Sequence, residues 1–141
     1  MKRSILYLDD DAASLKIFQE TFGKDYDVRT AISEREAHLM LMERPAEIII
    51  SDQVMPEIEG TEFLRGIAAK YPSSYRVLLT GGVMLGNVVH EVCAGIVQLF
   101  VAKPWTEQDI RQMLERASMS LNLQNRSRAL RTASGEQKDS I

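Results

Sequence analysis

Residues 5–11 read ILYLDDD, a continuous apolar run that stops at three consecutive acids. A short run of this kind is typical of a strand that is buried on both faces. The acids at 9–11 then lie at the carboxyl end of that strand. From residue 12 the apolar positions take a helical spacing that continues to residue 22. The opening therefore predicts a buried strand, an acidic edge and a crossover helix.

The same alternation of a short apolar run with an amphipathic helical segment repeats along the chain. Because each pair of parallel strands needs a crossover helix, the repeat predicts a doubly wound α/β fold with a five-stranded parallel sheet and five flanking helices. The fourth helix has the weakest pattern, since it contains an interior glycine and several β-branched residues. The expected strands are 5–8, 26–31, 48–50, 76–80 and 97–102, and the expected helices are 12–22, 33–44, 60–70, 82–92 and 106–123.

The composition is that of an ordinary globular domain. The 141 residues are 45% apolar and 26% charged, and the formal net charge of −3 gives no reason to expect a nucleic-acid or membrane partner. The single cysteine, Cys93, excludes an internal disulfide and a zinc site built from several cysteines. No apolar run approaches the roughly 18 residues that span a bilayer. We therefore expect a cytoplasmic protein.

The apolar pattern divides the chain near residue 123. Residues 1–123 are expected to form one domain, and 124–141 a polar, fraying helical extension or linker. The extension holds four basic residues and two acidic ones, a net charge of +2. Its basic residues lack aromatic neighbours or a known motif, so a nucleic-acid-binding arm is not expected.

Polar side chains follow four of the predicted strands. Asp9 and Asp10 end the first strand, Asp52 follows the third, Thr80 ends the fourth and Lys103 follows the fifth. Ligands of doubly wound sheets bind beyond these carboxyl ends, so the five side chains are expected to meet at one edge. Neighbouring carboxylates with no histidine or cysteine nearby favour Mg²⁺. A hydroxyl and an ammonium opposite a metal-bound carboxylate would stabilise a phosphoryl group, which makes Asp52 a candidate phosphoryl acceptor.

The order of these motifs, from residue 3 to about 120, resembles the receiver domain of two-component response regulators, which has a flavodoxin- or CheY-like fold. The motifs that carry the resemblance are Asp9-Asp10, Asp52 with Met55-Pro56 and Gly60, Thr80, Phe100 and Lys103-Pro104. The resemblance implies that Asp52 accepts a phosphoryl group from a histidine kinase or phosphotransfer protein. It also implies that Asp10, Asp52 and the Val54 carbonyl bind Mg²⁺ directly and that Asp9 acts through water.

The resemblance also implies the remaining roles at this edge. Thr80 and Lys103 would hold the phosphoryl oxygens, backbone groups of Val54 and Gly81 would contact them, and Phe100 would turn inward on activation. Such a domain is a switch that catalyses only its own phosphorylation and dephosphorylation. Its output face, the fourth helix, fifth strand and fifth helix, is a candidate homodimer surface.

Two short motifs also resemble particular subfamilies of receiver domains. Leu79-Thr80-Gly81 and Lys103-Pro104-Trp105 are similar to receivers that precede HD-GYP phosphodiesterases or hydrogenase-regulating transcription modules. An output domain of either kind is therefore a candidate partner outside this chain.

Two alternatives remain open at this level. Asp9-x-Asp11 resembles the start of haloacid-dehalogenase-like phosphatases, in which Asp9 would be the nucleophile and Asp11 the general acid. Ala13, however, stands where that motif has Thr or Val. The other alternative is a receiver-like scaffold that binds partners without phosphorylation. Asp11 is better explained as a residue at the start of the first helix, where the helix dipole favours an acid.

Overall fold

The computed structural model of the chain describes residues 2–81, 90, 92, 94–102 and 104–139. Five parallel strands form one sheet in the order β2-β1-β3-β4-β5. The helix expected at 82–92 lies outside the described residues except for positions 90 and 92. The elements are β1 (Ser4–Leu8), α1 (Ala12–Phe22), β2 (Asp27–Ala31), α2 (Glu34–Glu43), β3 (Ile48–Asp52), α3 (Gly60–Lys70), β4 (Tyr75–Thr80), β5 (Leu99–Ala102) and α5 (Glu107–Asp139).

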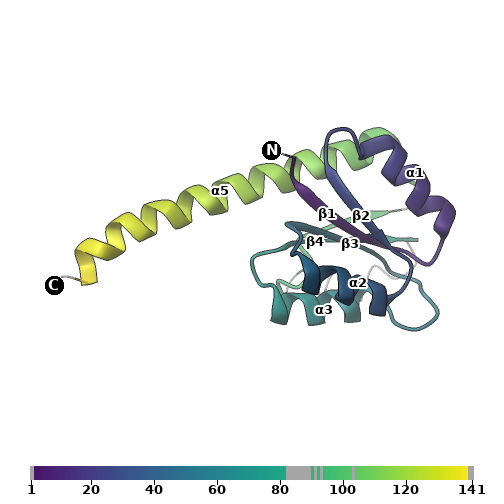
Figure 1. The fold of residues 1–141 in the computed structure, drawn as a ribbon, viewed down its shortest axis with the longest axis horizontal. Helices are drawn as coiled ribbons and strands as arrows, with labels where there is room; N and C mark the ends of the chain where they lie inside the picture. The colour runs from purple at the N-terminus through teal and green to yellow at the C-terminus, as the bar shows by residue number, and fades with distance from the viewer. Residues whose placement is uncertain (1, 82–89, 91, 93, 103, 140–141) are drawn as a thin grey trace.

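Alternate residues of the sheet face two separate helical layers. Ile5 and Tyr7 of β1 pack in a core with α1 and α5, whereas Leu6 and Leu8 pack in a second core with α2 and α3. Figure 1 shows these two pairs of helices on opposite sides of the sheet. The predicted doubly wound fold class is confirmed, with four helices in the described part of the chain.

The starts of α2 and α5 are capped by short polar side chains. The Ser33 hydroxyl accepts the backbone N–H of Glu36 at 3.2 Å, and the Thr106 hydroxyl accepts that of Asp109 at 3.1 Å. Ser33 and Thr106 are therefore the N-caps of α2 and α5. The capped starts of α2 and α5 satisfy backbone donors that would otherwise lack a partner.

Each strand differs from its sequence prediction at one boundary, by one or two residues. β5 begins at Leu99, two residues later than expected. Val97 is fully buried without being part of the ladder, so an apolar pattern alone extends the strand too far. The next residue, Gln98, uses its side-chain oxygen to accept the Arg76 backbone N–H at 2.8 Å, and its own N–H donates to the Arg76 carbonyl at 2.9 Å.

Arg76 of β4 is a buried cation at the edge of the sheet opposite the acids. Its side chain donates to the carbonyls of Ser74, Gly95 and Ile96 at 2.9, 3.1 and 2.7 Å. Burial lowers the pKa of this guanidinium. The contacts join the segment before β4 to the segment before β5, so Arg76 organises the amino end of the sheet.

Helix α5 extends far beyond the sheet, as Figure 1 shows. Its residues in the core run from Ile110 to Leu121, whereas residues 125–130 are all exposed. The extension or linker was expected at 124–141, and the described helix continues through this region to Asp139. The domain boundary at residue 123 stays a prediction. None of the described helices is both long enough and apolar enough to cross a membrane.

Candidate functional site

Three carboxylates gather at the carboxyl edge of the sheet. Asp9 and Asp10 follow β1, and Asp52 is the last residue of the neighbouring strand β3. One oxygen from each of the three lies within 4.8 Å of the others. Asp9 and Asp52 are buried, at 1% and 6% exposure, whereas Asp10 is exposed. The cluster is therefore anchored in the protein on one side and open to water on the other.

The end of β3 is held by an unusually close approach of α3. The Gly60 N–H donates to the Gln53 carbonyl at 3.0 Å, and the Gln53 N–H donates to the Leu79 carbonyl at 2.9 Å. A Cβ atom on Gly60 would lie 2.3 Å from the Asp52 carbonyl oxygen, well inside contact distance. Only glycine permits this approach, and it fixes the peptide that carries Asp52.

Gln53 is a buried polar residue that the sequence analysis did not single out. Its side-chain oxygen accepts the Thr61 N–H at 2.9 Å, and its amide nitrogen donates to the Thr61 hydroxyl at 3.3 Å. These bonds connect the residue after Asp52 to the first turn of α3. A polar residue directly after a strand-end acid is the only sequence signal for this role.

Asp9 is oriented by two donors from its own segment. The Tyr7 hydroxyl donates to Asp9 Oδ2 at 2.6 Å, and the Asp11 N–H donates to Asp9 Oδ1 at 3.0 Å. Burial, reinforced by the hydrogen bond to Asp9, raises the pKa of the Tyr7 phenol far above its usual range. The sequence places Tyr7 in an apolar run and gives no direct sign of this hydrogen bond. Its position two residues before Asp9, which directs both side chains to the same side of the chain, is the signal that could have predicted the contact.

Asp11 points its side chain into the start of α1. Its carboxylate accepts the Ala13 N–H at 3.1 Å and the Ser14 hydroxyl at 2.9 Å, so it is the N-cap of that helix. This is close to the helix-start role expected for it. A side chain engaged in this way is poorly suited to act as the general acid of a phosphatase.

The structure describes four of the other predicted residues, Thr80, Gly81, Val54 and Phe100. Thr80 is buried at the end of β4, directly after Leu79, which is the register partner of Asp52. Gly81 follows Thr80 and is exposed, as is Val54. Phe100 of β5 is partly buried against the core on the α2 and α3 side of the sheet. Lys103 lies outside the described residues.

The donor set fits a magnesium ion. Mg²⁺ prefers hard oxygen ligands, is bound through few carboxylates and retains several waters. Asp9, Asp10 and Asp52 supply carboxylate oxygens, and the exposed side of the cluster at Asp10 leaves space for water. A pocket of about 120 Å³ beside Asp10, lined also by Ser33, Met55 and Pro56, widens that open side.

Comparison with known families matches residues 5–115 to the response regulator receiver domain. The chain belongs to this family. Receiver domains are generally switches rather than enzymes; they work with histidine kinases and output domains and use Mg²⁺ at an acidic pocket. The Asp9, Asp10 and Asp52 cluster of this receiver domain is compatible with such a pocket. Neither the phosphatase nor the scaffold alternative is favoured by this match.

The proteins similar to this receiver domain differ in the share of their own length that the chain covers. The hydrogenase transcriptional regulatory protein HoxA of Cupriavidus necator is 26% identical over 86% of this chain, which spans only 25% of HoxA. The chemotaxis protein CheY of Listeria monocytogenes is 30% identical over 80% of this chain and 97% of its own. A crystal structure described as adenylate cyclase from Rhodopirellula baltica has a TM-score of 0.85 and 29% identity, covering 92% of this chain and 97% of that one. The receiver domain is thus similar to nearly the whole of the Listeria CheY chain and to about a quarter of HoxA.

Proposed function

We propose that Asp52 of this receiver domain accepts a phosphoryl group from a histidine kinase or phosphotransfer protein. The observation that supports this assignment is the carboxylate cluster, in which buried Asp9 and Asp52 and exposed Asp10 bring ligand atoms within 4.8 Å of one another. Asp52 is the member that ends a central strand, beside the strand that carries Thr80. The proposal includes the cytoplasmic location expected from the sequence.

The roles at the site follow from this assignment. Asp9, Asp10, Asp52 and the Val54 carbonyl hold Mg²⁺, which when bound offsets the negative charge that gathers on the phosphoryl oxygens. An Asp52 carboxylate oxygen forms the new bond to phosphorus while the bond from phosphorus to the kinase histidine nitrogen breaks, and the imidazole leaves. The Thr80 hydroxyl, the Lys103 ammonium and backbone groups of Val54 and Gly81 bind the transferred oxygens.

Intact mass spectrometry tests the acceptor. After incubation with Mg²⁺ and acetyl phosphate, the wild-type chain should gain the mass of one phosphoryl group, and Asp52→Asn should not. Asp25→Asn is the matched control, because Asp25 is an exposed carboxylate whose hydrogen-bond partner, Arg111, lies on α5. Persistence of the adduct in Asp52→Asn would refute the assignment. Release of inorganic phosphate that depends on Asp9 would support the phosphatase instead.

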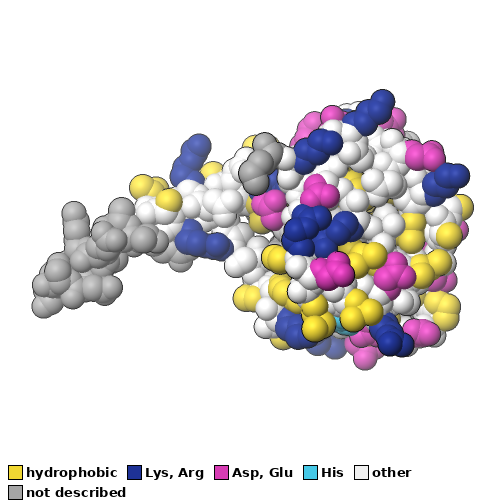
Figure 2. Space-filling view, in the orientation of Figure 1, with side chains coloured by type: hydrophobic (Ala, Val, Ile, Leu, Met, Phe, Trp, Pro, Cys, Tyr) yellow, Lys and Arg dark blue, Asp and Glu magenta, His cyan; other side chains and the backbone are white. Residues whose placement is uncertain are grey.

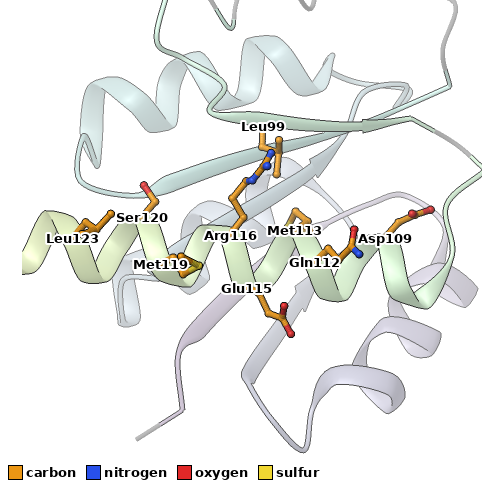
Figure 3. A pocket seen from close by; sticks show the side chains of 9 residues that line it. All are labelled: Leu99, Asp109, Gln112, Met113, Glu115, Arg116, Met119, Ser120 and Leu123. Carbon is orange, nitrogen blue, oxygen red and sulfur yellow. The ribbon is translucent and has the colours of Figure 1, made fainter.

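The output face of the proposed switch includes β5 and α5. A groove of about 700 Å³ runs along α5 beside Leu99, and the exposed Met119 and Leu123 lie in its lining, as Figure 3 shows. Phosphorylation draws Thr80 toward the phosphoryl group, Phe100 follows, and this face gains affinity for a second copy of the chain. The part of the face expected from the fourth helix lies outside the described residues.

Light scattering tests the dimer. With Mg²⁺ and beryllofluoride, a phosphoryl mimic, the solution mass of the wild-type chain should double, and Met119→Lys should prevent the increase by placing a charge in the groove. Met42→Lys, an equally exposed methionine on α2, is the control. An unchanged mass on beryllofluoride binding would rule out the dimer and leave the acceptor assignment untouched.

An output domain outside this chain completes the proposal. The similarity to HoxA, of which this chain spans a quarter, supports a transcriptional output, with an HD-GYP output as the alternative. This receiver domain itself is not expected to contact nucleic acid. Sequencing of the gene beyond Ile141 distinguishes these outputs.

A further inference from the structure

Tyr7 of β1 and Asp9, the first residue after β1, are two residues apart in nearly extended chain. The rise of a strand separates such residues by about 6.6 Å, a gap that a tyrosine side chain leaning along the strand can bridge. The structure has this arrangement, with the Tyr7 hydroxyl 2.6 Å from Asp9 Oδ2. A buried residue of the core therefore reaches the acidic cluster directly.

The Tyr7 ring is enclosed by the core. It is fully buried, packs in the core between the sheet and α1, and makes a tilted ring contact with Phe18 at a centroid distance of 4.8 Å. Phe18 in turn contacts Phe22 at 4.9 Å. The hydroxyl is therefore placed by rigid packing, so it can define the direction of the carboxylate that accepts its hydrogen bond.

The hydrogen bond uses one specific oxygen of Asp9. Tyr7 donates to Oδ2, and the backbone N–H of Asp11 donates to Oδ1, so the carboxylate is held at both oxygens. Free rotation of Asp9 about its side-chain torsions is thereby removed.

We propose that Tyr7 is a positioning residue of the metal site, whose phenol fixes the Asp9 carboxylate and thereby sets the affinity of the cluster for Mg²⁺. The inference rests on the metal site of the proposed function. Side chains that bind a metal ion are oriented by hydrogen bonds from neighbouring residues. Loss of one such hydrogen bond typically weakens metal binding by about 10- to 100-fold. A tyrosine that served only as a core aromatic would have no such effect.

Calorimetric titration with Mg²⁺ tests the inference. Tyr7→Phe keeps the ring and removes the hydroxyl, and we expect it to bind Mg²⁺ about tenfold more weakly than the wild type. Tyr75→Phe is the matched control, because Tyr75 is also a buried tyrosine of the sheet but lies at the first position of β4, at the opposite edge from the acids. It should bind Mg²⁺ as the wild type does. Equal affinity in Tyr7→Phe and wild type would overturn the inference.

A second measurement needs no variant at position 7 that folds. Binding of a cation to Asp9 weakens the hydrogen bond from Tyr7. Mg²⁺ should therefore shift the ultraviolet absorption band of tyrosine in the wild type and in Tyr75→Phe. No spectral change while calorimetry records binding would contradict the inference alone. Failure of the wild type to bind Mg²⁺ at all would remove the metal site, and with it the proposed function and this inference together.

Discussion

Gly60 shows how a single missing side chain supports the site. A Cβ atom at this position would lie 2.3 Å from the Asp52 carbonyl oxygen and 2.8 Å from Leu78 Cδ1. We expect Gly60→Ala to lower the free energy of unfolding by about 1–3 kcal/mol, the usual cost of overpacking, because either backbone or core must shift. The displaced Asp52 should also bind Mg²⁺ more weakly. Urea denaturation and calorimetry measure the two effects.

Gly66 provides the control within the same helix. A Cβ atom on Gly66 meets nothing within 4 Å, so Gly66→Ala should stabilise α3 by about 0.5–1 kcal/mol through its better helix propensity. If both substitutions changed stability in the same direction, close approach at Asp52 would not be the reason for glycine at position 60.

At the level of single residues, the sequence predicted the gathering of the acids better than the contacts that orient them. Asp9 and Asp52 follow apolar runs, and the topology of a parallel sheet brings such positions to one edge, where the structure places them within 4.8 Å of each other. Tyr7 and Gln53 escaped notice because their roles depend on which neighbour their polar atoms meet. A tyrosine in an apolar run has the same pattern whether its hydroxyl reaches a carboxylate or water.

The two roles considered for Asp11, N-cap of α1 and general acid of a phosphatase, predict different effects of its substitution. As an N-cap it accepts the Ala13 N–H and the Ser14 hydroxyl, so Asp11→Ala should cost about 1 kcal/mol of stability. Its contact to Asp9 uses the backbone N–H, which the substitution retains. We therefore expect Asp11→Ala to melt at a lower temperature yet still gain a phosphoryl group from acetyl phosphate. Loss of the adduct in a folded Asp11→Ala would point to a chemical role for this carboxylate.

The elements themselves were predictable where local signals agreed. Hydroxyl caps at Ser33 and Thr106 mark helix starts in both sequence and structure. The start of β5 was missed because strand pairing is a long-range property: Val97 is buried like a strand residue, but the ladder to β4 begins only at Leu99. Burial fixes the apolar pattern, whereas hydrogen bonding to a distant strand fixes the boundary.

On the scale of the whole molecule, the two cores define which parts of the chain fold together. Both contain sheet residues, and among the side chains that the structure describes, the core residues of α5 run from Ile110 to Leu121. Figure 2 shows basic side chains on the part of α5 that projects from the body of the protein before the grey end of the chain. Among the hydrogen bonds of the described residues, Arg128 to Ser73 at 3.1 Å joins this projecting part to the domain.

Truncation tests whether the domain ends where its core does. A chain that ends at residue 123 loses the exposed residues 125–130 and the surface bond from Arg128, so its free energy of unfolding should fall by no more than about 1 kcal/mol. A chain that ends at residue 112 loses buried Met113, Leu114 and Leu121 and should not fold, because each such side chain contributes about 1.5–3 kcal/mol. Urea denaturation followed by circular dichroism compares the two. A large loss of stability in the chain that ends at residue 123 would show that the projecting helix belongs to the folding unit. The contacts responsible would then include those around the cavity of about 290 Å³ between α5 and Tyr71.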